Sequence, residues 1–398
     1  MIPYLLLFQI FIVFISSSIL FFVPGLFEYK QLVVGVNMIS ILMAFYEIFR
    51  RNYNGGFIKS ILIYAVILVL CYNVTGLLYD YHSEWYYSYR LLVAGQTAPV
   101  LLTSAIVASN RLYQFRLEKI VPYLAILFTV VAIIVTLNPR TAAQGLAGDE
   151  DANLNYQSVS YLAAYGCSLA LFYIYNFNKI AWGRILRKRI SKWIFVGVVI
   201  VNLLTILFSG GRGGLMTYLV LVSYFFYLSI LDGKKHILRP IFTIAILMLI
   251  GYYVLTIVEN SSLETSGFHR ILEFVNEGNT SGREHNYALA WDVFLDSPVI
   301  GHGVGGIFCT LGFYSHNVFL DIMIDTGVIG LIFFVVFIIK IIKKGLYLSR
   351  LDPHNTFWMF IFLDGFTMNL FSGCYLSGLL WISASVVIFY NYKNRSTI

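Results

Sequence analysis

The chain has 398 residues, of which 59% are hydrophobic and 12% are charged, and its formal net charge is +7 at pH 7. This composition excludes a soluble globular domain, in which charged residues are about twice as frequent. The basic excess would suggest nucleic-acid binding in a soluble protein. Membrane topology accounts for it here, with some attraction to membrane lipid headgroups, so we expect no nucleic-acid partner.

Twelve apolar segments, each about long enough to cross a bilayer, divide the sequence. The first lacks a basic n-region and a cleavage motif, so we interpret it as a retained span. The prediction is a single all-α polytopic integral membrane domain over residues 1–398, with about twelve transmembrane helices. In chain order the predicted spans are residues 3–23, 31–49, 58–79, 91–109, 120–137, 157–178, 193–209, 214–231, 240–258, 316–339, 356–371 and 376–391.

The basic residues are divided unevenly between alternate connections. Counted from a cytoplasmic N-terminus, the even-numbered connections and the C-terminal tail hold 21 of the 27 Lys and Arg residues. Positive charge is retained on the cytoplasmic side during insertion. Both termini are therefore predicted to be cytoplasmic. The odd-numbered connections, predicted to lie outside, hold the remaining six: Lys30, Arg90, Arg140, Arg212, Arg270 and Arg283.

The outer connection at residues 209–214 reads SGGRGG. Glycines allow a tight turn, and the helix that follows would begin with unsatisfied N–H groups and a positive dipole end. The bidentate guanidinium of Arg212 makes this turn suited to a diphosphate, held by Arg212 together with Gly211 and Gly213. A tight turn whose arginine only extends to the membrane interface is an equally good interpretation.

Residues 259–315 form the largest outer, periplasmic loop, between the ninth and tenth predicted transmembrane helices. Its centre has the Ser281 to Glu284 spacing of a capping box. Tyr287, Trp291, Phe294 and Leu295 follow at helical spacing and predict a short amphipathic helix over residues 282–295, which Pro298 ends. Arg283 lies in the first turn, where a cation opposes the helix dipole. It either binds an anion or is a solvated arginine.

The segment GHGVGG at residues 301–306 has glycines spaced as in a dinucleotide-binding pattern. That interpretation fails because a helical membrane protein contains no βαβ unit. The glycines are instead predicted to let the chain double back against the membrane surface. Cys309 and Cys374 both fall on the outer side, where a disulfide is permitted, but their spacing does not show that they approach each other.

Polar residues mark the start of the tenth predicted span. Asn317, Asp321 and Asp325 follow His316 in the sequence. They are four residues apart, which places their side chains as a polar stripe on one face of the helix. A carboxylate this far along a span is expected to face the bundle interior or a hydrated cavity, which Asp364 in the next span would also border. His316 would then lie at the mouth of a polar cleft, where its imidazole exchanges protons. A capping or interfacial histidine is the alternative.

Two arginines, one histidine and recessed carboxylates are thus predicted on one membrane face. Two guanidinium groups can hold a diphosphate, and a histidine can deprotonate a hydroxyl. Together they could move a glycan from a lipid diphosphate to a sugar acceptor. A neutralised diphosphate leaves readily, so electrostatic stabilisation can replace a metal. The outer loops show no metal-ligand spacing, so we expect neither a metal nor another cofactor.

Three blocks of the sequence carry a family resemblance through their order and spacing: residues 209–214; residues 282–291, 296–298 and 301–305; and residues 316–317 and 325–330. They resemble the superfamily of O-antigen polymerases and O-antigen ligases. The resemblance implies a GT-C-like, metal-independent glycosyltransferase of the bacterial cytoplasmic (inner) membrane that uses undecaprenyl-diphosphate-linked oligosaccharide repeat units. In that family the matching arginines engage the donor diphosphate and the matching histidine is catalytic. This implies these roles for Arg212, Arg283 and His316, on the periplasmic face. The family often has Glu where Asp325 stands, which leaves the role of this carboxylate open. The three blocks together span about residues 209–330.

The acceptor distinguishes a polymerase from a ligase within this superfamily. A polymerase transfers the growing glycan to the next lipid-linked repeat unit, and a ligase transfers it to lipid A–core. The many aromatic residues (29 Tyr and 33 Phe), the modest outer loop and the short termini favour a polymerase, whose chain-length control could require a separate regulator. A transporter or flippase of the same lipid is a second alternative, although the ionisable groups gather only toward the outer half of the last spans.

Overall fold

The computed structural model describes residues 1–11, 15, 29–50, 55–78, 84–137, 156–233 and 283–395. Every regular element in these ranges is a helix. The helices are α1 (Ile2–Ile10), α3 (Tyr29–Arg50), α4 (Gly55–Leu78), α5 (Glu84–Leu92), the π-helical η1 (Val93–Thr97), α6 (Ala98–Ala108), α7 (Arg111–Leu137), α9 (Tyr156–Asn176), α10 (Arg189–Ser209), α11 (Arg212–Leu231), α14 (Arg283–Asp296), α15 (Gly306–Thr310), α16 (Val318–Leu351), α17 (Asn355–Phe371), the 3-10 helix η3 (Tyr375–Ser377) and α18 (Leu379–Lys393).

Seven helices in the described part of the chain are long and apolar enough to cross a membrane. The described part of the chain is therefore all-helical, and its seven candidate spans are consistent with a multi-pass membrane protein. The predicted span 240–258 lies outside the described residues, as does most of span 3–23. The total of twelve spans and a GT-C-like arrangement stay predictions. The seven candidate spans are residues 55–78, 86–108, 111–137, 157–176, 189–209, 212–231 and 318–351.

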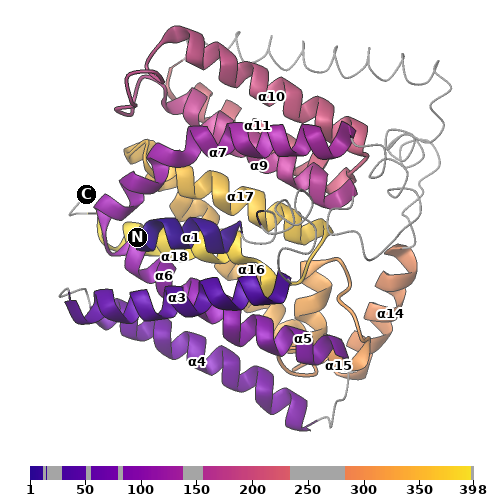
Figure 1. The fold of residues 1–398 in the computed structure, drawn as a ribbon. Coiled ribbons are helices and arrows are strands. Elements are labelled where there is room, and N and C mark those ends of the chain that lie inside the picture. The colour runs from indigo at the N-terminus through magenta and orange to yellow at the C-terminus, as the bar shows by residue number, and fades with distance from the viewer. Residues whose placement is uncertain are drawn as a thin grey trace, which may run out of the picture.

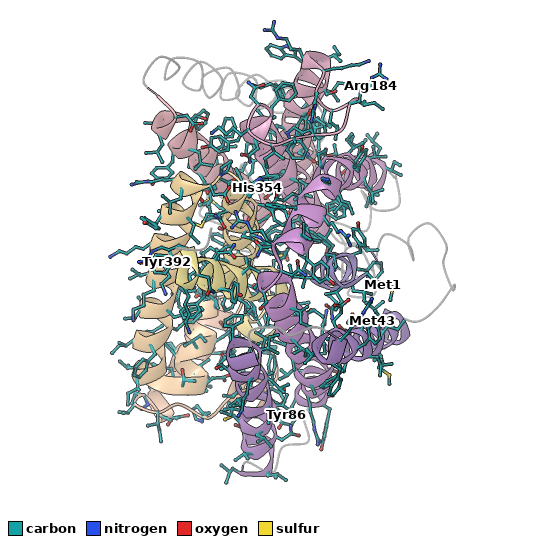
Figure 2. The ribbon with its side chains drawn as sticks, turned by 90° about the vertical axis from the view of Figure 1, so that its left-hand side faces the viewer. Met1, Met43, Tyr86, Arg184, His354 and Tyr392 are labelled. Atoms are coloured by element: carbon teal, nitrogen blue, oxygen red, sulfur yellow. The ribbon has the colours of Figure 1, made fainter. Side chains whose placement is uncertain are left out.

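The helices lie side by side and run between two ends of the molecule (Figure 1). Both labelled termini and the connection between α9 and α10 lie at the left-hand end, while α14 and α15 lie at the right-hand end. Arg184, Arg187 and Lys188 are exposed in the α9–α10 connection. Viewed from that end, Arg184 lies at one edge of the bundle and Tyr86 at the other (Figure 2). The right-hand end is the one predicted to be outside.

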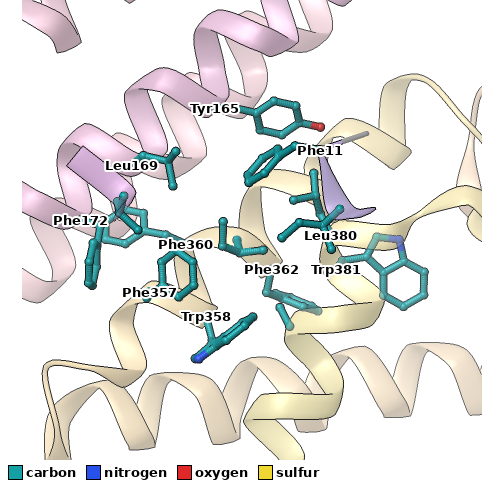
Figure 3. Close-up of a cluster of buried hydrophobic side chains, with 14 of the residues drawn as sticks. Phe11, Tyr165, Leu169, Phe172, Phe357, Trp358, Phe360, Phe362, Leu380 and Trp381 are labelled. Carbon is teal, nitrogen blue, oxygen red and sulfur yellow. The ribbon is translucent and has the colours of Figure 1, made fainter. Parts of the chain in front are cut away.

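Aromatic side chains fill the interior where α9, α17 and α18 meet (Figure 3). Phe172 of α9 packs edge to face on Phe357 of α17, with ring centroids 5.5 Å apart. Phe360 and Phe362 are fully buried beside them. Lipid tails are as apolar as these side chains, so close packing rather than removal from water holds spans together.

α16 is broken at Gly327, whose backbone has φ 63° and ψ −168°. One helix therefore ends just before Gly327, and a second continues from Val328 to Leu351. The predicted span 316–339 is wrong in its bounds, because a straight helix cannot pass through a left-handed residue. The break places the carboxylate of Asp325 at the end of a short outer helix instead of partway along a continuous span.

A cluster of charged side chains ties α7 to the turn between α16 and α17 at the left-hand end. Arg111 pairs with Asp352, and His354 pairs with Glu118. Asp352 also accepts a hydrogen bond from the backbone N–H of His354, at 3.0 Å. The Phe115 ring lies 4.5 Å from the imidazole. These contacts fix the α16–α17 turn against α7.

The pKa of His354 lies above its ordinary value. Burial alone would lower this pKa, but the hydrogen bond and charge of Glu118 and the charge of Asp352 outweigh burial and the opposing charge of Arg111. Because the folded pKa exceeds the unfolded value of about 6.5, the pairing contributes fully to stability below that pH. The contribution is lost as the pH rises through the folded pKa.

The melting temperature of the detergent-solubilised protein should therefore fall as the pH rises from about 6 to 9. His354→Gln should flatten this dependence, because glutamine does not titrate in this range. His285→Gln, at an exposed position of α14, is the matched control and should leave the slope unchanged. An unchanged slope in the His354 variant would contradict the assignment.

Candidate functional site

The outer end of the bundle has a small core of its own. It is formed by α4, α5, α14, α15, the outer part of α16 and the connection between α17 and α18. The Tyr89 ring stacks on Phe308 with centroids 3.9 Å apart. This core fixes the outer segments on the spans. Its fully or nearly buried members are Tyr72, Tyr86, Tyr89, Val93, Ala290, Phe294, Ile307, Phe308, Ile324, Cys374 and Leu376.

α14 confirms the short helix predicted over residues 282–295, although Ser281 and Gly282 lie outside the described residues. Its predicted apolar face is only partly buried. Phe294 is buried against the outer core, whereas Trp291 and Leu295 are 47% and 55% exposed. The amphipathic prediction is wrong for these two side chains, because the helix turns Ala290 and Phe294 toward the outer core.

The glycine segment 301–306 packs backbone to backbone on the break in α16. The N–H groups of His302 and Gly303 donate to the carbonyls of Ile324 and Asp325, both at 2.8 Å, and Val328 N–H donates to the Pro298 carbonyl at 2.9 Å. A Cβ atom on Gly301 would lie 2.4 Å from the Asp325 carbonyl carbon. The chain does double back as predicted, and the surface that receives it is the broken helix.

Asp325 holds this segment through its carboxylate. It accepts hydrogen bonds from the N–H groups of Gly305 and Ile307, at 2.7 and 2.8 Å, and from the Tyr375 hydroxyl at 2.7 Å. The side chain is fully buried. Of the two environments predicted for this carboxylate, the buried interior is confirmed: its oxygens bind the glycine segment and the α17–α18 connection.

Asn317 and Asp321 organise the start of α16. The Asn317 side chain caps the helix by accepting from the Phe319 N–H at 3.0 Å. Asp321 is fully buried, and its Oδ1 accepts from the N–H and the hydroxyl of Ser315, at 2.9 and 2.6 Å. Asn317 and Asp321 of the predicted polar stripe thus bind backbone and side-chain groups at the start of α16 and at Ser315, just before it.

His316, between Ser315 and Asn317, has a strained backbone conformation. Its φ of 62° is the one positive value of a non-glycine residue in the described ranges, and such outliers persist only where surrounding contacts impose them. The Tyr314 ring packs on the imidazole with centroids 4.5 Å apart. Burial, and then the cation of Arg283, lower the pKa of His316 to about 4.

Arg283 therefore lies near enough for its charge to act on His316. The same cation opposes the rise in the pKa of Tyr314, which burial raises to about 12. Arg283 is the first residue of α14 and is partly exposed. The outer end thus presents a neutral imidazole beside a guanidinium.

Arg212 begins α11 after the predicted tight turn, in which Gly210 has φ 73° and Gly211 is the N-cap. Close packing explains the absence of a side chain at Gly213: a Cβ there would lie 1.9 Å from the Tyr161 hydroxyl. It would also lie 3.2 Å from Cβ of Phe371, where α17 ends. The connection that follows carries the tyrosine bound to Asp325. The α17–α18 connection thus begins next to Gly213 and contains the tyrosine that binds Asp325.

Other predicted features have a plainer role. No group of three or more His, Cys, Asp or Glu side chains in the described ranges could hold a metal ion. Cys309 and Cys374 are free thiols. Asp364 is buried within α17, and neither of its oxygens has a hydrogen-bond partner among the described residues. Its nearest charged or polar neighbours include Ser168 and Tyr165 of α9.

Three residues that shape the site had no predicted role: Tyr314, Ser315 and Tyr375. Ser315 directly precedes the predicted histidine, so a turn motif there could have been found. Tyr375 stands in a short segment bounded by Gly373 and Gly378, which marks a tight connection. The sequence carries no signal for the ring contact of Tyr314.

Gly327→Ala should destabilise the protein far more than Gly312→Ala. Both residues have positive φ, but a Cβ on Gly312 meets nothing within 4 Å, whereas one on Gly327 lies 2.2 Å from the Val299 carbonyl oxygen. We expect about 1 kcal/mol for the left-handed alanine at residue 312 and several-fold more at residue 327. Melting temperatures in detergent measure both. Equal losses would contradict the close packing of the glycine segment on α16.

Comparison with known protein families supports the resemblance. Residues 197–335 match the family model described as O-antigen ligase. The matched segment contains Arg212, Arg283, His316 and Asp325, and hence the turn, the outer helix and the break in α16. No curated protein matches the chain. Residues 197–335 are therefore similar to the O-antigen ligase family, which supports the resemblance of the chain to the superfamily of O-antigen polymerases and ligases.

Proposed function

We propose that the protein is a surface-polysaccharide polymerase of the bacterial inner membrane. It transfers a glycan from undecaprenyl diphosphate to the sugar of an incoming lipid-linked repeat unit, on the periplasmic face. The observation that carries this proposal is the strained backbone of His316 within the segment that matches the family model, and the charge of Arg283 acting on this histidine supports it.

The arginines are assigned to the donor diphosphate. A guanidinium offers paired N–H donors that match phosphate oxygens, and Arg283 stands at the first turn of α14. Arg212 stands at the first turn of α11, where helix N–H groups have no intrahelical partner and the dipole favours an anion. Gly211 and Gly213 would contribute through their backbone N–H groups.

His316 is assigned to the acceptor. Its imidazole takes the proton of an acceptor hydroxyl as that oxygen attacks the anomeric carbon of the donor glycan. The bond between the anomeric carbon and the diphosphate oxygen breaks, and the electron pair leaves with the diphosphate. The arginines stabilise the charge that develops there, which is the main electrostatic requirement of the step.

Donor binding and proton uptake are coupled in this arrangement. In the free protein the cation of Arg283 disfavours protonation of His316. A diphosphate bound to Arg283 would offset that cation and raise the affinity of the imidazole for a proton. The base would then become effective when the donor is in place.

Arg283→Ala, His316→Ala and Arg212→Ala should each abolish long chains while the protein remains inserted and abundant. Loss of one electrostatic or proton-transfer contribution typically costs about 10²–10⁴-fold in rate. Arg187→Ala, the same change at an exposed residue of the opposite end, is the control. Chain length on a glycolipid gel is the measurement. Normal chains in all three site variants would end the proposal.

The pH dependence of kcat/KM tests the state of the histidine. With a pKa of about 4, His316 is neutral from pH 6 to 7.5, so titration of its imidazole should not change kcat/KM between these values. The neutral form of an imidazole with the ordinary pKa of about 6.5 would increase roughly fourfold as the pH rises from 6 to 7.5. A fourfold rise in kcat/KM with that pH dependence would show that the pKa of His316 is not lowered.

The ligase is the second candidate, because the matching family model is described as O-antigen ligase. It would use the same donor chemistry and differ in the acceptor, lipid A–core. Deleting the gene separates the two: loss of a polymerase leaves core with a single repeat, and loss of a ligase leaves core with none. A polymerase would also act with a chain-length regulator, and metal independence belongs to the proposal in either case.

A further inference from the structure

Two buried polar atoms near Ser315 have no hydrogen-bond partner among the residues that the structure describes. They are Nδ1 of His316 and Oδ2 of Asp321. Buried polar atoms in proteins are nearly always paired, so an unpaired one requires an explanation. One of these atoms is a donor or acceptor on the proposed catalytic imidazole, and the other is a carboxylate oxygen, which can accept.

Ser315 brings the two groups close together. Its N–H and its hydroxyl both donate to Oδ1 of Asp321, at 2.9 and 2.6 Å, and His316 is the next residue in the chain. Successive Cα atoms are about 3.8 Å apart, so the Asp321 carboxyl group lies about one residue from the His316 backbone. A rotation of the imidazole, or one bridging water, would join Oδ2 to Nδ1.

We infer that Asp321 is the positioning residue of His316: its Oδ2 accepts a hydrogen bond from Nδ1–H, directly or through one water. This inference rests on the proposed function. A neutral imidazole carries one N–H, and the partner of one nitrogen decides the state of the other. With the proton on Nδ1, Nε2 is left bare and can take the proton of an acceptor hydroxyl.

The surroundings of the histidine favour this arrangement. The Tyr314 ring covers one side of the imidazole at 4.5 Å, and the left-handed backbone at His316 restricts where the ring can turn. Arg283 lies near the imidazole as a cation. When Nε2 takes a proton, a carboxylate at Nδ1 offsets the repulsion between the imidazolium and this guanidinium.

Asp321→Asn separates positioning from simple support. The substituted carboxamide keeps an oxygen to accept from Ser315, so the turn before α16 is retained, but its NH₂ group replaces the acceptor Oδ2. It would favour the tautomer with Nε2–H, which cannot act as the base. We expect kcat to fall on the order of 10²–10⁴-fold, with KM within about twofold. Asp292→Asn, at an exposed residue of α14, should change neither.

Ser315→Ala distinguishes the remaining explanation. It removes the hydroxyl donor to Asp321 but leaves the N–H donor and the carboxylate. If Asp321 served only to hold Ser315, this variant would lose as much activity as Asp321→Asn. We expect it to lose less than about tenfold. Activity of Asp321→Asn equal to that of the unchanged protein would overturn the inference.

The tautomer can also be observed without the reaction. Nitrogen NMR of the protein labelled in histidine, with His316→Gln to assign the signal, should show the proton on Nδ1. In Asp321→Asn the proton should move to Nε2. A proton on Nε2 in the unchanged protein would overturn the inference, even if Asp321→Asn fails to fold. A proton on Nδ1 in a protein that extends no lipid-linked repeat would refute the proposed polymerase and leave the positioning of His316 standing.

Discussion

The break in α16 is the constraint on which the outer end of the protein depends. At Gly327 the helix stops and restarts, and the groups freed by the break bind the segment that precedes α15. Non-helical backbone within a membrane protein must find such partners, because lipid offers none. Asp325 completes the junction by binding two N–H groups of the glycine segment and the hydroxyl of Tyr375. The loop, the helix and the α17–α18 connection therefore form one unit.

This unit sets the position of the chemically active side chains. α14 is tied to it through Ser297, whose hydroxyl donates to the Gly301 carbonyl at 2.9 Å, and through the His302 ring, which contacts the Val293 carbonyl at 2.9 Å. Arg283 is thereby held at the far end of α14. His316 follows Ser315, whose N–H and hydroxyl both donate to the carboxylate of Asp321. A guanidinium and a shielded imidazole are thus presented by rigid elements, as a site that must align two large lipid-linked substrates requires.

Periodicity and composition predicted the parts of this fold that depend on local sequence. Long apolar runs predicted a helix at each of the seven candidate spans, although the bounds of the predicted spans 120–137 and 316–339 were wrong. Helical spacing predicted α14, and both predictions follow from side-chain pattern alone. The glycines of the 209–214 turn predicted its tight geometry. The family match supports the resemblance to the O-antigen polymerase and ligase superfamily, and the matched residues 197–335 include all three blocks.

Long-range packing accounts for what the sequence did not predict. The break at Gly327 depends on the approach of residues 298–303, which local pattern does not contain. Burial was predicted for Asp325, but nothing in its neighbourhood reveals that Gly305, Ile307 and Tyr375 donate to it. Gly213 was predicted to contribute a backbone N–H to an anion site, and the sequence does not reveal that Tyr161 leaves no room for a side chain there. In each case a contact between distant segments decided the role.

Extension of a defined lipid-linked repeat unit by the purified protein tests the central claim most directly. In detergent, with no second compartment, mass spectrometry should detect glycolipids of two or more repeats together with free undecaprenyl diphosphate, and His316→Ala should form neither. A transporter cannot produce this result, and a ligase would need lipid A–core. Absence of extension by the unchanged protein, or equal extension by His316→Ala, would contradict the assignment of this site as the polymerase.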